Sequence, residues 1–238
     1  MEATVQASLT IDRFCLRRVN SDMKKIIRIE GIPFPGAKIY SIIARKFFRD
    51  FYKEVTEEVV LRISSGRILD VGTGPGYLPL EIAKRSQNLE IIGIDISSAM
   101  VKIASRNAEN MGLSERVKFK VGNAASLPFE DRYFDFVVST ASLHHWLKPM
   151  ECIKEIYRVL KEDGEVWIYD IRRDTTREEE KQVRRKYGWF LSFLLLNIIR
   201  IHSSITLKEV KEILSSEIKF SKEIIEDKGV IFKLRLLK

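Results

Sequence analysis

The hydrophobic positions of this chain recur with two different periods. Between residues 39 and 63, apolar side chains return every four positions, which predicts one long helix with a single apolar face. Short apolar runs of strand length follow, most of them separated by stretches with helical periodicity. They lie at residues 68–71, 90–95, 117–121, 133–140 and 165–171. Strands that alternate with helices predict an α/β fold, in which helices cover both faces of a parallel sheet.

Local signals mark where the helices between these strands begin and end. A helix over residues 77–84 starts directly after a glycine-rich turn. Ser97 can cap a second helix, and Gly112 stops it. Pro149 suits the first turn of a third helix, which is predicted to end near Leu160.

The last third of the chain departs from this rhythm. A charged helical run begins at residue 174 and passes into an apolar run that ends near residue 200. Thr206-Leu-Lys-Glu209 has the pattern of a capping box and predicts a short helix. Two strand-like runs, 218–225 and 230–236, flank a predicted turn at 226–229 and indicate a hairpin. A parallel sheet closed by such a hairpin differs from the usual dinucleotide-binding dehydrogenase.

Length and composition are those of an ordinary globular protein. With 238 residues, 45% of them hydrophobic and 31% charged, the chain can form one α/β domain with an appendage. Its net charge of +8 comes from the two flanks, because residues 61–170 are nearly neutral. We therefore expect the charge to serve substrate or surface attraction rather than the central site.

The chain carries few signals for disulfides, metals or membranes. Cys15 and Cys152 are too few for a disulfide framework, and their spacing suits no metal site. The N-terminus lacks the apolar core of a signal peptide. The longest apolar stretch, residues 189–201, is shorter than the ~20 residues of a membrane span. We expect a soluble, cytoplasmic protein with no transmembrane segment and no metal; its oligomeric state stays open.

The most informative stretch joins the first strand to the helix that follows it. Gly72, Gly74 and Gly76 occupy alternate positions there. Glycine lets a ligand lie against the main chain, and the helix that begins beyond it presents unpaired N–H groups. Asp70, just before the loop, suits a cofactor with a positively charged amino group. This corner is therefore predicted to bind a cofactor rather than to be a plain turn.

Polar residues after the next strands provide for a nucleoside. Asp95 lies at a suitable distance from the glycine loop to accept hydrogen bonds from ribose hydroxyls, and its charge disfavours a 2′-phosphate. Asn123 can offer its amide oxygen to an adenine amino group. A pyrophosphate is less well provided for, because Tyr77 stands where the dehydrogenase pattern requires a third glycine.

Several of these motifs, in this order, resemble those of the class I S-adenosylmethionine-dependent methyltransferases. The stretches that carry the resemblance are ILDVGTGPG, the acid in IIGIDIS, VGNAASLPF, FDFVVSTASLHHW and LKEDGEVWIYD. The chain is most similar to the small-molecule group that includes quinone-biosynthesis methyltransferases. The resemblance implies a Rossmann-like seven-stranded sheet of order 3-2-1-4-5-7-6, with strand seven antiparallel and the hairpin as its last two strands.

The resemblance also implies S-adenosyl-L-methionine as cofactor, bound along the carboxyl ends of the strands. The glycine loop would hold the methionine part, Asp95 the ribose hydroxyls, and Asn123 the adenine edge, where the family usually has aspartate. The implied cofactor-binding residues are Asp70, Gly72, Thr73, Gly74, Gly76, Tyr77, Asp95, Ile96, Asn123, Ala124 and Ser139.

Two adjacent histidines are the candidate catalytic residues. His144 and His145 follow the fourth strand, so either one could act as a base toward a substrate hydroxyl. Equally, one could pack against Trp146 while the other is solvated. Methyl transfer from a sulfonium depends more on in-line positioning than on acid–base help, so the reaction does not require either of them.

We predict residues 1–60 as a helical lid and residues 61–238 as the methyltransferase domain, with a cap insertion at about 174–205. The basic and aromatic residues of that cap could touch a lipid surface, but a helix over the substrate pocket is the plainer interpretation. The predicted function is methyl transfer from S-adenosylmethionine to a small-molecule acceptor by direct displacement.

Three alternatives stay open. The basic flanks suit an RNA methyltransferase acting on tRNA or rRNA. A NAD-dependent oxidoreductase is disfavoured by Tyr77 and the terminal hairpin. A non-catalytic cofactor-binding module is compatible with every pattern in the sequence.

Overall fold

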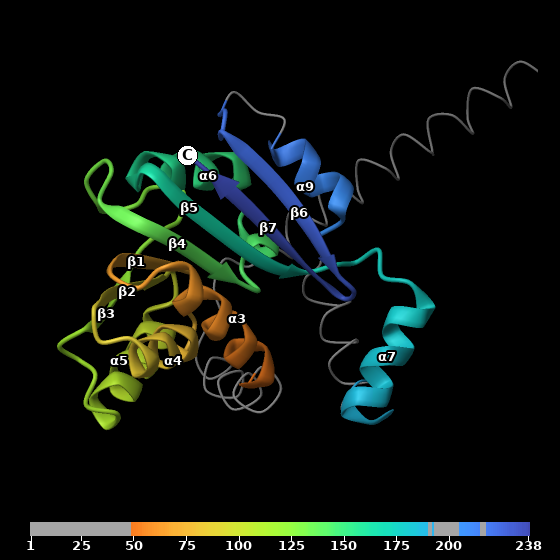
Figure 1. Cartoon of the computed structure of the whole chain (residues 1–238), viewed down its shortest axis with the longest axis horizontal. Coiled ribbons are helices and arrows are strands. Elements are labelled where there is room, and N and C mark those ends of the chain that lie inside the picture. Colours follow the sequence, from red (N-terminus) through yellow and green to blue (C-terminus); the bar gives the residue numbers. More distant parts are fainter. Residues whose placement is uncertain (1–48, 190–191, 193–204, 215–217) are drawn as a thin grey trace, which may run out of the picture. The chain divides into compact units, whose positions relative to one another are not determined.

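A seven-stranded sheet with the strand order β3-β2-β1-β4-β5-β7-β6 organises the computed structural model (Figure 1). The structure describes residues 49–189, 192, 205–214 and 218–238, all within the unit Gly31–Lys238. β7 runs antiparallel to both β5 and β6, and the other pairings are parallel. The predicted fold class and strand order are therefore confirmed. The strands are β1 (Gly66–Val71), β2 (Leu89–Asp95), β3 (Val117–Val121), β4 (Phe134–Thr140), β5 (Leu160–Ile171), β6 (Lys222–Lys228) and β7 (Ile231–Leu237).

The helices between the strands begin and end close to the predicted residues. Ser97 caps α5 by accepting a hydrogen bond from Met100 N, and Thr206 and Glu209 form the predicted capping box before α9. The part of the predicted 39–63 helix that precedes residue 49 lies outside the described residues. The helices are α3 (Arg49–Arg62), α4 (Tyr77–Arg85), α5 (Ser98–Asn110), α6 (Pro149–Val159), α7 (Arg177–Tyr187) and α9 (Leu207–Leu214), with a 3-10 turn η1 (Leu143–His145).

Alternate residues of the central strands face two separate apolar cores. Ile68 of β1 packs in the cluster that contains Val55 and Val59 of α3 together with buried residues of α4. Its neighbour Leu69 packs in the cluster built from α6 and α9. Because the strands are buried on both faces, they appear in the sequence as continuous apolar runs. Figure 1 shows these helices on opposite sides of the sheet.

The closing hairpin differs from its prediction. The predicted turn at 226–229 is mostly strand, because β6 continues to Lys228 and pairs in register with β7 as far as Lys228↔Ile231. The actual turn contains Gly229, whose φ of 80° is left-handed. Backbone pairing in an antiparallel edge strand does not require apolar side chains. The end of β6 was therefore not recognised from the apolar pattern, because it contains the charged residues Glu226 and Asp227.

The fifth strand also begins earlier than predicted. β5 starts at Leu160 rather than Glu165, and its register with β4 shifts between Phe134↔Leu160 and Phe136↔Glu165. Asp163 has a φ of 61°, so the predicted Asp-Gly turn is an irregularity inside the strand.

Helix α3 is joined to the last three strands in the chain by hydrogen bonds to Glu58. Glu58 accepts hydrogen bonds from Lys228, from Lys233 (2.5 Å) and from the hydroxyl of Tyr169 (2.8 Å). Partial burial raises the pKa of Glu58, but these donors outweigh it and lower the pKa to about 2. Lys233 is itself buried and lies 3.4 Å from the centre of the Trp167 ring. The helix is thereby fixed to β5, β6 and β7.

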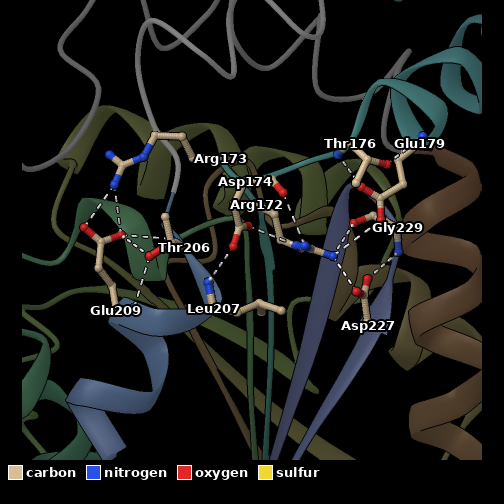
Figure 2. A network of polar contacts seen from close by, with 10 residues as sticks. All are labelled: Arg172, Arg173, Asp174, Thr176, Glu179, Thr206, Leu207, Glu209, Asp227 and Gly229. Carbon is tan, nitrogen blue, oxygen red and sulfur yellow. Dashed lines mark hydrogen bonds and ion pairs between the residues drawn. The ribbon is translucent and has the colours of Figure 1, made fainter.

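Arg172, directly after β5, is the centre of a second charged cluster, shown in Figure 2. Its buried guanidinium donates to Asp174, Asp227 and the carbonyl of Gly229, and Glu179 of α7 lies 3.5 Å from it. These partners come from the chain after β5, from the start of α7 and from the β6–β7 hairpin.

Arg173 joins the same region to α9. Its Nη2 donates to both carboxylate oxygens of Glu209, at 3.0 and 3.1 Å. Arg172 also forms a parallel bridge with Ile205, and Asp174 accepts from the backbone N–H of Leu207. Residues 172–174 and 205–209 are thus side by side. We call these two segments the stem. The stem lies at the two ends of the predicted 174–205 insertion, and the division of the chain into a lid, a domain and this insertion stays a prediction.

None of the described helices is long and apolar enough to cross a membrane.

Candidate functional site

The carboxyl end of β1 carries a buried charge without a partner. Asp70 is 1% exposed, and within the described residues neither of its carboxylate oxygens has a hydrogen-bond partner. Burial raises its pKa to about 7; the nearby Thr73 hydroxyl opposes this rise and the negative Asp95 adds to it. An unpaired buried carboxylate costs free energy, so its presence here indicates a site for a positively charged ligand group.

The predicted glycine loop begins two residues after Asp70, at Gly72, and lies open at its middle. Gly72, Gly74 and Gly76 all have left-handed φ angles between 52° and 77°. A Cβ placed on Gly74 would meet nothing within 4 Å, whereas one on Gly72 would lie 2.0 Å from Ser142 Oγ. The loop therefore exposes backbone at Gly74 and is packed against the β4–α6 connection at Gly72.

Asp95 closes the loop from the end of β2. One carboxylate oxygen accepts from the backbone N–H of Gly74 and the other from that of Ser97, both at 2.8 Å. Burial raises the pKa of Asp95, and these two backbone hydrogen bonds oppose the rise. Each oxygen has a further lone pair, so the carboxylate can still accept from two neighbouring hydroxyls.

The predicted adenine-binding residues have mixed surroundings. Ile96 is 38% exposed, which leaves an apolar surface beside Asp95. Asn123 is exposed, but its amide oxygen already accepts from the backbone N–H of Ala125 (2.8 Å). This oxygen caps the turn after β3, a use that sequence reasoning missed. Ala124 is partly buried against the core.

Two serines join the end of β4 to the cofactor loop. Ser139 is fully buried and its hydroxyl donates to the backbone carbonyl of Val71 (2.8 Å). Ser142 lies against Gly72 and accepts a hydrogen bond from the indole N–H of Trp146 (3.1 Å). Ser139 therefore holds the backbone of the loop in place, while Tyr77 begins α4 and packs near Tyr52.

The two candidate histidines are adjacent but differ in burial. His144 is buried, and its Nδ1 lies 2.6 Å from Oδ1 of Asp170, near the end of β5. His145 is partly exposed, with its ring centre 4.1 Å from that of His144. Sequence reasoning missed Asp170, although an acid at the end of a strand, as at Asp70 and Asp95, was the available signal.

Taken together, the carboxyl ends of β2, β1, β4 and β5 place acids, open backbone and a histidine along one edge of the sheet. Ligands of parallel α/β sheets bind at this edge. Within the described residues, no group of three or more His, Cys, Asp or Glu side chains is arranged to hold a metal ion.

Comparisons with known proteins identify the class. A family model described as a methyltransferase domain matches residues 63–228. An uncharacterised methyltransferase of Bacillus subtilis, YcgJ, is 38% identical over 104 residues, which are 44% of this chain and 40% of that protein. The ubiquinone/menaquinone biosynthesis C-methyltransferase UbiE of Geotalea daltonii is 36% identical over 107 residues, 44% of this chain and 46% of that protein. The matched region thus spans less than half the length of either curated relative.

A solved structure extends the similarity over most of the chain. An S-adenosyl-L-methionine-dependent methyltransferase assigned in Methanococcus maripaludis superposes with a TM-score of 0.69 at 27% identity, covering 88% of this chain and 96% of that one. The chain therefore belongs to the methyltransferase-domain family. Its class is that of the Rossmann-like, S-adenosyl-L-methionine-dependent methyltransferases, as its motifs imply.

The cofactor of this class, S-adenosyl-L-methionine, fits the residues at the sheet edge. It carries a positively charged amino group and a sulfonium, and the unpartnered Asp70 carboxylate is suited to such a cation. It carries no pyrophosphate. This agrees with Tyr77, which occupies the position of the last glycine in the pattern of dinucleotide-binding sites.

Proposed function

We propose that this chain transfers the methyl group of S-adenosyl-L-methionine to a small-molecule nucleophile by direct displacement. The observation that carries the proposal is the buried Asp70 carboxylate, which has no hydrogen-bond partner among the described residues and lies near the open backbone at Gly74. When bound, the cofactor supplies an electrophilic methyl group, and the protein supplies its binding and alignment.

In this proposal each residue of the edge holds a different part of the cofactor. Asp70 accepts from the amino group, and Asp95 accepts from the ribose hydroxyls with the lone pairs that Gly74 and Ser97 leave free. Ile96 packs on the adenine, and the remaining contacts come from the glycine loop and from the turn after β3. That set is Gly72, Thr73, Gly74, Gly76, Tyr77, Asn123, Ala124 and Ser139.

A small-molecule acceptor is favoured over RNA by the surface charges and by a relative. Lys84, Lys148, Lys181 and Lys208 each pair with a glutamate one helical turn away, so these cations alternate with acids. A stripe of unpaired cations is the usual footprint of a nucleic-acid interface. The name of UbiE places that relative in quinone biosynthesis, which supports a small-molecule acceptor.

The direct test is calorimetric titration with S-adenosylmethionine and S-adenosylhomocysteine, followed by transfer of labelled methyl to acceptor panels of small molecules and of tRNA. Saturable cofactor binding and methylated small-molecule products are expected. Absence of cofactor binding at millimolar concentration would contradict the proposal. Methylation confined to tRNA, with affinity that falls steeply as salt rises, would favour the RNA alternative.

A paired substitution tests whether the site is placed correctly. Asp95→Ala is expected to weaken S-adenosylhomocysteine binding by at least about tenfold, because two hydrogen bonds to a charged group are worth more than 1.4 kcal/mol. His144→Ala, further along the edge, should change the affinity much less. Equal losses in the two variants would mean that the cofactor lies elsewhere.

A further inference from the structure

The buried carboxylate of Asp170 contacts both the ring and the backbone N–H of His144. Asp170 is fully buried; its Oδ1 lies 2.6 Å from the Nδ1 of His144 and accepts from the backbone N–H of Ile171 at 2.7 Å. Its Oδ2 accepts from the backbone N–H of His144 itself at 2.9 Å. Each oxygen thus accepts one backbone N–H.

This arrangement fixes the tautomer of the histidine. The short contact to His144 holds one proton between Nδ1 and Oδ1, and a carboxylate at Asp170 leaves that proton on Nδ1. The neutral imidazole then has its lone pair on Nε2. A carboxylate that fixes imidazole in this way also stabilises the imidazolium that forms when Nε2 takes up a proton. The pair is therefore built to accept a proton at one defined atom.

The pair lies next to the cofactor loop. Ser142, two residues before His144, is packed against Gly72, so η1 continues directly from the contact with that loop. On the other side, Ala141 N donates to the carbonyl of Tyr169, the residue before Asp170 (2.8 Å). The histidine is therefore held between the glycine loop of β1 and the end of β5, on the edge where a methyl acceptor has to approach.

We propose that His144 accepts the proton of the methyl acceptor, that Asp170 is its positioning residue, and that the acceptor carries a hydroxyl group, as a phenol or alcohol does. This inference rests on the proposed methyltransferase function and specifies its substrate class. A neutral amine or a thiolate has an available electron pair, whereas a hydroxyl is a weak nucleophile until its proton leaves.

The proton transfer balances without any further reactant. The acceptor O–H proton moves to Nε2 of His144, and the O–H electron pair stays on oxygen and forms the new bond to carbon. The pair of the broken carbon–sulfur bond stays on sulfur, which becomes a neutral thioether. The imidazolium then releases its Nε2 proton to water, and the Nδ1 proton stays on the ring, hydrogen-bonded to Asp170, throughout.

The first test needs no acceptor. Histidine-selective nitrogen-15 NMR at pH 8 should show a protonated Nδ1 and an unprotonated Nε2 in His144. The signals can be assigned readily because the chain has three histidines. Asp170→Asn should abolish this fixed tautomer, whereas Asp131→Asn, a matched change at an exposed acid, should leave it unchanged. A protonated Nε2 in the wild-type protein would overturn the proposal.

The second test separates proton transfer from cofactor binding. We expect His144→Gln and Asp170→Asn to bind S-adenosylhomocysteine as the wild type does. With a phenol probe, we expect kcat in His144→Gln to fall by about 100-fold, the usual contribution of a general base, and to recover in part as pH rises. With the corresponding thiophenol, which is already ionised at pH 8, kcat should be nearly unchanged.

Two results would count against the inference in different ways. Equal losses with phenol and thiophenol would make the pair purely structural, and a wild-type enzyme that methylates amine probes but no hydroxyl probe would refute the substrate class. Failure of the wild type to bind S-adenosylhomocysteine would instead refute the proposed function, while the NMR result would still decide the state of His144.

Discussion

Asp70 and Arg172 are both buried charges near the carboxyl ends of strands, β1 and β5 respectively, and their surroundings are opposite. Arg172 has carboxylates from several segments around it, as Figure 2 shows. Asp70 has no hydrogen-bond partner within the described residues. A charge that stabilises the fold is paired by the fold, because an isolated buried charge is costly. A charge left unpaired at a strand end is therefore best explained by a ligand. The presence or absence of partners thus distinguishes the structural charge, Arg172, from the binding charge, Asp70.

The largest expected effect comes from removing the paired charge. Arg172→Met should lower the free energy of unfolding by about 3 kcal/mol, because clustered carboxylates lose their shared cation. Thermal unfolding should shift down by roughly 6–12 °C for a chain of this size. S-adenosylhomocysteine affinity, measured by calorimetry, should stay within about twofold, and a large loss of affinity would show that the stem also shapes the cofactor site.

Removal of the unpaired charge should have the opposite sign. Asp70→Asn should raise the stability of the cofactor-free protein at pH 8 by about 2 kcal/mol, because no charge then remains buried. The same substitution should weaken S-adenosylhomocysteine binding by about 10- to 100-fold, since it removes a charge-assisted hydrogen bond. Chemical denaturation and calorimetry measure the two effects. A variant that is less stable than the wild type would place Asp70 among the structural charges.

The pH dependence of stability gives a smaller and independent signal. The folded-state pKa of Asp70 is about 7, above its ordinary value of 3.8, so the folded protein binds this proton more tightly. The contribution of Asp70 is therefore fully present below pH 3.8 and is lost as pH rises toward 7. The slope is at most ~1.4 kcal/mol per pH unit. It should appear as a difference between wild type and Asp70→Asn in denaturation series from pH 5 to 8, and parallel curves would contradict it.

The smallest effect is expected at the exposed neighbour of Arg172. One guanidinium nitrogen of Arg173 donates to both oxygens of Glu209, but the two side chains are 47% and 39% exposed. Arg173→Ala should therefore cost at most ~1 kcal/mol, and high salt should reduce the difference. Thermal unfolding at low and high salt checks this, and a loss as large as that of Arg172→Met would mean that exposure does not decide the strength of the stem.

Contacts that are local in sequence could be predicted, and those set by strand register could not. Asp70 and the glycine loop are close in sequence, and Asp95 follows at the spacing typical of nucleoside-binding sites, so these residues could be predicted from the sequence. The strand order came from the family resemblance rather than from the apolar pattern. Asp170, by contrast, reaches His144 only because β5 lies parallel to β4, with Thr140 opposite Tyr169.

The same limit applies to side chains that have two possible partners. Arg172 and Asp227 are far apart in the sequence, and the hairpin alone brings them together. Asn123 is predicted from its chemistry to bind adenine, and the structure adds that its oxygen caps a turn. An amide can serve either purpose, and a single sequence does not say which is used.

The attachment of α3 to the closing hairpin has a consequence for how the protein is made. Glu58 pairs with Lys228 and Lys233, residues that leave the ribosome long after α3 itself has been synthesised. Until then Glu58 lacks both lysine partners, and the final strands of the sheet are not yet there. Contacts so distant in sequence form slowly, and the nascent chain exposes apolar surface in the interval.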